Sequence, residues 1–125
     1  MTAKKGGSGR LRKIEAELQR VLAELIAREV KDPRVGNVTI TGVSLAADMG
    51  VAKVFYAPFV SAHPQAEVQS GLNRAAGFLR GEAGRRLGLR HAPRLDFVFD
   101  DTAEKAARLT GLIDRAVAGD TDKHS

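Results

Sequence analysis

The sequence predicts a single α+β domain in which helices alternate with short strands over 125 residues. Apolar residues recur at steps of three and four over 11–31, which indicates an amphipathic helix. Apolar and polar residues alternate over 38–45, 51–60 and 95–99, which indicates three strands. A second helical rhythm over 64–87 separates the second strand from the third.

The first helix is predicted to begin at Leu11 and to end near Lys31, because Pro33 disfavours the α conformation at the residue before it. Its apolar positions form one stripe: Leu11, Ile14, Leu18, Val21, Leu22, Leu25, Ile26 and Val30. Glu24 and Arg28 stand at the favourable spacing for an ion pair on the opposite face. We expect this helix to serve as scaffold.

The first two strands are predicted to form a hairpin connected by residues 46–50. The alternation slips at Gly42, which predicts a β-bulge there. Pro58 indicates a strand end or a sheet edge. Aromatic residues of the second strand could stack on bases, but packing against a helix is the stronger expectation. These residues are Phe55, Tyr56 and Phe59.

The second helical segment carries more glycines than a straight helix favours. They are Gly71, Gly77, Gly81, Gly84 and Gly88. Each interior glycine costs about 0.5–1 kcal/mol relative to alanine. A helix that tolerates several is expected to be bent, broken, or approached closely by another backbone.

The third strand, 95–99, is expected to bury one face. A capping box with Asp101 at the N-cap and Glu104 three residues later predicts a final helix that extends to about residue 117. The domain organisation that follows is a flexible basic arm at 1–10, an ordered domain at 11–118 and a disordered tail at 119–125.

Positive charge is concentrated in two segments. The net charge of the chain is +5, yet residues 1–13 alone carry +5 and residues 71–94 carry another +5, so the remainder is acidic. Clustered positive charge indicates a polyanionic partner, with nucleic acid first. The alternative is that these charges only keep the protein in solution.

The residues expected for catalysis or metal binding are missing. The chain has no cysteine, and His63, His91 and His124 are scattered without metal-ligand spacing. No phosphate-binding loop, dinucleotide fingerprint or nucleophile motif occurs. We therefore expect a protein that is not an enzyme and needs no cofactor or metal. No signal peptide and no apolar run near 18 residues are present, which predicts a cytoplasmic location without a membrane partner.

Through the third strand, the element order matches the type II KH fold, an RNA-binding architecture. KH domains usually bind RNA at a GxxG loop. A literal match occurs at 81–84, but its Glu82 would face a phosphate, so this match is not taken as the RNA-binding loop.

A closer resemblance covers nearly the whole ordered chain. The block REVKDPRVG at 28–36, followed by VTI at 38–40, resembles the bacterial ribosome-binding factor A family. The segments AKV at 52–54, AAGFLR at 75–80 and PRLDFVFD at 93–100 are also similar to that family, in the same order and spacing.

This resemblance implies a KH-like domain in which the GxxG loop is replaced by a helix–kink–helix around an Ala-x-Gly motif. Here that motif is Ala75-Ala76-Gly77, and residues 81–84 fall in the second helical arm. Family members bind the free 30S small ribosomal subunit. They assist late maturation, including processing of the 5′ end of 16S rRNA, are linked to growth in the cold and are not nucleases. The glycine-rich basic arm and short C-terminal tail depart from some relatives.

The candidate RNA-binding residues are the Ala-x-Gly motif and the basic residues of the two positive segments. They are Arg74, Ala75, Ala76, Gly77, Arg80, Arg85, Arg86, Arg90, Lys4, Lys5, Arg10, Arg12 and Lys13. A helix turns about 100° per residue, so these arginines cannot share one face. Arg85 and Arg86 are expected to make the best adjacent pair.

Two other functions stay open at the level of sequence. We expect the protein to be a monomer. A protein-interaction module could instead dock on a ribosomal protein or another assembly factor through a sheet edge or the first helix. An enzyme acting on rRNA would require catalytic residues that the sequence does not offer.

Overall fold

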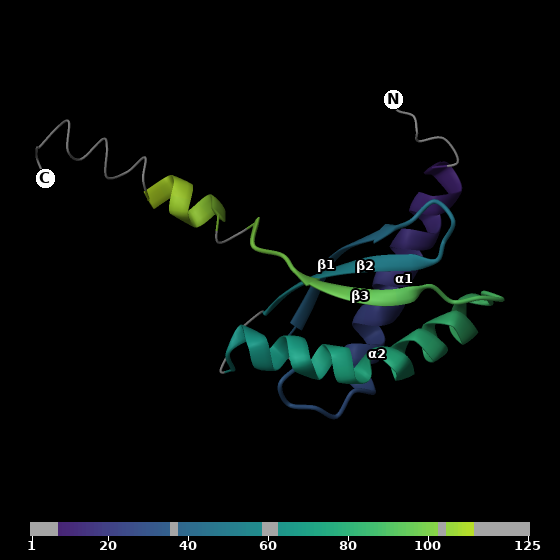
Figure 1. The fold of residues 1–125 in the computed structure, drawn as a ribbon, viewed down its shortest axis with the longest axis horizontal. Helices are drawn as coiled ribbons and strands as arrows, with labels where there is room; N and C mark the ends of the chain where they lie inside the picture. Colours follow the sequence, from purple (N-terminus) through teal and green to yellow (C-terminus); the bar gives the residue numbers. More distant parts are fainter. Residues whose placement is uncertain (1–7, 36–37, 59–62, 103–104, 112–125) are drawn as a thin grey trace, which may run out of the picture.

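The α+β class and the element order predicted from the sequence are confirmed. The computed structural model describes residues 8–35, 38–58, 63–102 and 105–111. The elements are α1 (Ser8–Arg28), β1 (Val38–Leu45), β2 (Val51–Pro58), α2 (Gln65–Leu87) and β3 (Arg94–Phe99). Residues 105–111 form a further helical segment. In Figure 1, α1 crosses behind the strands and α2 runs alongside them.

The sheet has the order β1-β2-β3, antiparallel between β1 and β2 and parallel between β2 and β3. The predicted hairpin is therefore present, and its turn places Met49 at a φ of 64°. The register shifts between Ile40 and Gly42, which confirms the bulge. Because β2 and β3 are parallel, α2 is the crossover between them.

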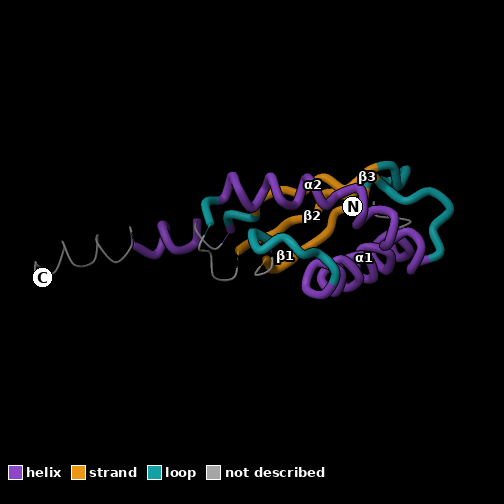
Figure 2. The backbone as a smooth tube through the Cα atoms, turned by 90° about the horizontal axis from the view of Figure 1, so that it is seen from below, coloured by secondary structure: helices purple, strands orange, loops and turns teal. Residues whose placement is uncertain are grey.

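The core lies between the sheet and the two helices. Alternate side chains of the strands are buried, including Val54 and Tyr56 on β2 and Phe97 on β3. The residues between them, such as Lys53 and Asp96, are exposed, so the helices cover one face of the sheet. Figure 2 shows α1 nearest β1 and α2 nearest β3.

The apolar stripe of α1 packs as predicted. Leu18, Val21, Leu22, Leu25 and Ile26 are buried. Polar residues of α1 also attach it to β1, because the Leu45 N–H donates to Glu15 Oε2 (2.7 Å) and Gln19 Nε2 donates to the Ile40 carbonyl (3.1 Å).

The aromatic residue of β2 that is fully buried serves packing rather than stacking. Tyr56 meets Phe99 edge-on with ring centroids 5.8 Å apart. Its hydroxyl donates to Gln69 Oε1 of α2 (2.6 Å). The expectation that strand aromatics pack against a helix is confirmed at this position.

Several element boundaries differ from the prediction. α1 begins at Ser8, so Arg10 is helical and the basic arm is shorter than residues 1–10. Helical packing of the residues that follow outweighs the weak propensity of Gly9. α1 ends at Arg28 and β2 at Pro58. Several predictions fall outside the described residues: Lys4 and Lys5, Gly36, Phe59, residues 112–117 and the tail.

The helix is not broken at Ala75-Ala76-Gly77, because α2 continues without interruption from Gln65 to Leu87. Figure 1 shows the axis of α2 changing direction along its length, and a kink centred on this motif stays a prediction. Leu72, Leu79 and Ala83 stay on one buried face across the motif. Burying a leucine contributes about 1.5–3 kcal/mol, which exceeds the cost of an exposed glycine. Residues 81–84 lie inside the helix, as expected.

Gly88 ends α2 in the left-handed conformation, with a φ of 65°. Its N–H donates to the Arg85 carbonyl (3.3 Å), and the N–H of Leu89 donates to the Gly84 carbonyl (2.9 Å). Glycine adopts this conformation without the clash that a Cβ would cause. The turn that follows leads the chain back to β3.

The last helical segment starts after Asp101, which confirms Asp101 at the N-cap. The N–H of Lys105 donates to the Asp101 carbonyl (2.8 Å), the first bond of the helix. The side chain of Asp100 accepts the N–H of Thr102 (2.9 Å) beside it. Glu104 lies outside the described residues.

Candidate nucleic-acid interface

One exposed face of α2 combines arginine, glycine and phenylalanine. Arg74, Gly77, Phe78, Gly81 and Arg85 are all exposed and are separated by steps of three and four residues. This spacing places them along a single stripe opposite the buried apolar side chains Leu72, Leu79 and Ala83. We refer to these five residues as the α2 face.

Phe78 is, with Gly81, one of two residues of this face that the sequence reasoning did not assign to the site. Its side chain is 47% exposed, and it stands between two arginines of the same stripe, four residues after Arg74 and seven before Arg85. An exposed aromatic ring beside cations can stack on a base while the cations contact phosphates. The signal in the sequence that could have identified Phe78 was its helical position, which does not fall on the apolar stripe formed by Leu72 and Leu79.

The two glycines of the α2 face leave the helix backbone uncovered. A Cβ built on Gly77 or Gly81 would meet nothing within 4 Å. A partner can therefore approach the helix more closely here than side chains would allow. Ala75 and Ala76 are half-buried and pack against the core, so only Gly77 of the Ala-x-Gly motif belongs to this face.

Arg80 and Arg86 contact other segments of the chain, whereas Arg85 pairs within α2. Arg80 donates from Nε (3.1 Å) and Nη2 (2.9 Å) to the Ala92 carbonyl. Arg86 Nη1 lies 3.8 Å from Glu24 Oε1 of α1. Arg85 pairs with Glu82 while its side chain stays 69% exposed. The structure thus separates Arg85 and Arg86, because neighbours in a helix diverge by about 100°.

The other predicted basic residues that the structure describes belong to other segments than the α2 face. Arg12 and Lys13 are exposed on the first turns of α1. Arg10 and Arg90 line a pocket together with Arg80. Glu24 pairs with Arg20 (3.7 Å) as well as with Arg86, rather than with the predicted Arg28.

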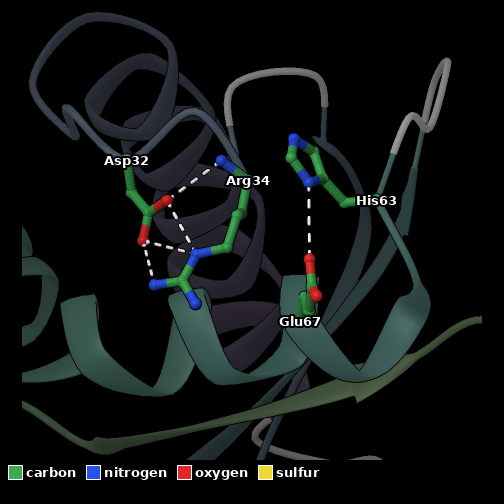
Figure 3. A network of polar contacts seen from close by, with 4 residues as sticks. All are labelled: Asp32, Arg34, His63 and Glu67. Carbon is green, nitrogen blue, oxygen red and sulfur yellow. Dashed lines mark hydrogen bonds and ion pairs between the residues drawn. The ribbon is translucent and has the colours of Figure 1, made fainter.

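An ion pair between two residues of the turn that follows α1 fixes the shape of that turn. Arg34 Nη2 donates to Asp32 Oδ2 (2.6 Å), and Arg34 Nε donates to the same carboxylate (Figure 3). These hydrogen bonds lower the pKa of Asp32 to about 2. Just before α2, His63 Nδ1 lies 3.5 Å from Oε1 of Glu67, in the first turn of that helix (Figure 3). Because Arg34 is engaged with Asp32, we assign it a structural role.

Gly71 explains why this turn can come so close. A Cβ at Gly71 would lie 2.9 Å from Val35 Cγ1 and 3.1 Å from Asp32 Oδ2. Val35 is fully buried, so it has little room to move. The motif at 32–35 is therefore a packing device between α1 and α2.

The residues that the structure describes contain no group of three histidine, cysteine or acidic side chains placed to hold a metal ion. Among the same residues, no helix is long and apolar enough to cross a membrane.

Comparison with known proteins identifies the family. The family model described as Ribosome-binding factor A matches residues 10–113. The chain belongs to the ribosome-binding factor A family. The ribosome-binding factor A of Thioalkalivibrio sulfidiphilus is 51% identical over 115 residues, covering 92% of this chain and 89% of the relative.

Solved structures of the family share the fold. The crystal structure of ribosome-binding factor A from Thermus thermophilus is 32% identical, with a TM-score of 0.62 over 70% of this chain and 92% of that chain. A homology model of the Thermus thermophilus factor, fitted into a cryo-EM map of its complex with the 30S subunit, gives a TM-score of 0.59 at 32% identity, with the same coverage.

Proposed function

We propose that this chain is a non-enzymatic ribosome assembly factor that binds the free 30S subunit through 16S rRNA. It assists late maturation of the subunit, including processing of the 5′ end of 16S rRNA, in the cytoplasm and with a role in cold adaptation. Its family membership and the 30S complex of the Thermus relative support the subunit as partner. The helices on one face of the sheet fit a KH-like domain.

The α2 face is the observation that carries this proposal. Arg74 and Arg85 would contact phosphates, which position a protein on RNA without reading its sequence. Phe78 would supply a ring on which a base can stack. Gly77 and Gly81 would let the RNA backbone lie against the helix, since no side chain covers it there.

The class of partner is tested by co-sedimentation of the full chain with small subunits, large subunits and whole ribosomes at two salt concentrations. We expect binding to free small subunits only, with an affinity that decreases as salt rises, because phosphate contacts release counterions. A shallow salt dependence that survives nuclease treatment would identify a protein partner instead. Cleavage of precursor rRNA by the purified chain alone would contradict a non-enzymatic role.

The site is tested by the double variant Arg74→Gln/Arg85→Gln in the same assay. Loss of two phosphate contacts is expected to weaken binding by about tenfold or more and to reduce the salt slope by about 1.4–1.8. The control is Arg28→Gln/Arg108→Gln, which removes the same charge from exposed positions outside the α2 face. Equal binding by the two double variants would overturn the site.

The role of Phe78 is tested by Phe78→Leu, which keeps an apolar side chain but removes the ring. Stacking on an aromatic side chain is worth about 1–3 kcal/mol per base, so binding should weaken by about tenfold or more. The thermal midpoint should change little, since the ring is half exposed. Binding equal to that of the parent would remove Phe78 from the interface.

A further inference from the structure

A pocket of about 460 Å³ lies where the start of α1, the β1–β2 turn and the end of α2 meet. Its lining includes Arg10 from α1, Asp48 and Met49 from the turn, and Arg80 from α2. The chain after α2 completes the lining of the pocket with Gly88, Leu89, Arg90, His91 and Ala92. None of the five residues of the α2 face contributes to it.

The charge of this pocket is strongly unbalanced. Three arginines oppose one carboxylate, a net charge of +2 with the histidine neutral. Asp48 is already engaged, because its Oδ1 accepts the N–H of Gly50 (2.9 Å). The pocket therefore has excess positive charge without a protein carboxylate to balance it.

Arg80 is held in place by the pocket wall. Its Nε and Nη2 donate to the Ala92 carbonyl at 3.1 and 2.9 Å, which fixes the plane of the guanidinium. Nη1 takes no part in these two bonds. A guanidinium with a fixed plane loses less conformational freedom when it binds an oxyanion.

We propose that this pocket binds the terminal phosphate of a nucleotide. A phosphate monoester carries a charge of about −1.5 to −2 at neutral pH, which matches the surplus, whereas a backbone diester carries one charge. Guanidinium groups are the preferred partners of phosphate oxygens. Arg10, Arg80 and Arg90 approach from three parts of the chain and surround the anion.

The size and the lining of the pocket favour a whole nucleotide over a bare ion. Small-molecule sites occupy about 300–1,000 Å³, and this pocket falls in that range. Met49, Leu89 and Ala92 supply apolar surface beside the arginines for a base or ribose. The ligand is either a free nucleotide or the 5′-phosphorylated end of an RNA, and both present the same chemistry. This inference goes beyond the proposed function, because it concerns a separate site.

The ligand is tested by calorimetric titration of the full chain with four probes: AMP, adenosine, and a short oligoribonucleotide with a 5′-phosphate or a 5′-hydroxyl. We expect AMP to bind and adenosine not to bind. Stronger binding of the 5′-phosphorylated oligonucleotide than of its 5′-hydroxyl form would identify an RNA end as the source, and binding of AMP alone would identify a free nucleotide. Failure of both phosphorylated probes, or equal binding with and without the phosphate, would overturn the proposal.

The residues are tested with Arg90→Gln and Arg10→Gln, which remove one cation each from different walls of the pocket. Loss of a charge-assisted contact should weaken AMP binding about tenfold in either variant. Both positions are exposed, so a thermal melt should confirm that the fold is intact. Arg28→Gln, the matched control outside the pocket, should bind AMP like the parent.

Parent-like AMP binding by both pocket variants, or an equal loss in the Arg28→Gln control, would overturn the assignment. The α2 face is read out separately by co-sedimentation with subunits. AMP binding can therefore fail while the Arg74→Gln/Arg85→Gln effect persists, and the reverse is equally possible, so the two proposals are distinguishable.

Discussion

The buried and the exposed glycines of α2 serve opposite purposes. Gly71 and Gly84 are buried, and each lies so near another segment that an added Cβ would come within 2.9 Å of a side-chain atom. Gly77 and Gly81 are exposed and face open space. The first pair permits close packing within the protein, and the second pair leaves a bare backbone between arginines. The role of a glycine in a helix therefore depends on which segments lie next to it in the folded protein.

The largest effect that separates the two faces is expected from Leu79→Ala. Leu79 is fully buried on the core side of α2, so truncation removes transfer free energy and leaves a cavity. We expect the free energy of unfolding to fall by about 2–5 kcal/mol, measured by urea denaturation. A loss below about 1 kcal/mol would show that the helix packs more loosely than its burial indicates.

Gly71→Ala tests the crowded glycines. The new methyl would lie 2.9 Å from Val35 Cγ1, and the β-branched, fully buried valine cannot turn away easily. Overpacking should lower the free energy of unfolding by about 1–3 kcal/mol, despite the better helix propensity of alanine. A more stable variant in urea denaturation would show that the turn at 32–35 can move.

Gly81→Ala is the matched change on the exposed face. Its methyl would meet nothing within 4 Å, so only helix propensity changes. The free energy of unfolding should rise by about 0.5–1 kcal/mol. Opposite signs for Gly71→Ala and Gly81→Ala would confirm the difference between the faces, and a shared sign would contradict it.

The smallest effect is expected from a change of pH, which titrates the carboxylate of Asp32 that pairs with Arg34 near Gly71. The pKa of Asp32 is lowered from 3.8 to about 2, so its ionised form stabilises the fold above pH 4 and this contribution is lost as the pH falls toward 2. Asp32→Asn should lower the thermal midpoint at neutral pH slightly, since partly exposed ion pairs contribute little. The difference from the parent should shrink on acidification.

Asp100 supplies the control for this titration. Its pKa is also lowered to about 2, through hydrogen bonds from Thr102 and Thr41, so the Asp32→Asn variant should keep part of the acid sensitivity. A difference between parent and variant that stays constant down to pH 2 would show that the pairing of Asp32 does not stabilise the fold.

Local patterns were sufficient for most of the fold. The steps of three and four in α1 identified the buried residues Leu18, Leu22 and Leu25, and the slipped alternation at Gly42 identified the bulge. Such patterns succeed because burial on one face imposes a fixed period on the sequence. The family blocks also led to the family that the comparisons show.

The site was less predictable from sequence. Glycine content alone suggested a break in α2, but tertiary burial of Leu72 and Leu79 keeps the helix continuous. Arg80 and Arg86 looked equivalent to Arg85, yet each contacts a different segment far away in the sequence. No local pattern records those contacts, because they depend on where α1 and the chain after α2 return in space.

By itself, the sequence determined the elements of this protein, their order, the buried stripe of each and its excess of positive charge. Only the tertiary structure decided which glycines are crowded, which arginines are engaged by other segments, and that Phe78 faces outward between Arg74 and Arg85. The physical reason is the separation along the chain of the residues that are involved. Periodicity follows from backbone geometry within a few residues, whereas a surface or a pocket is made by segments that only folding brings together.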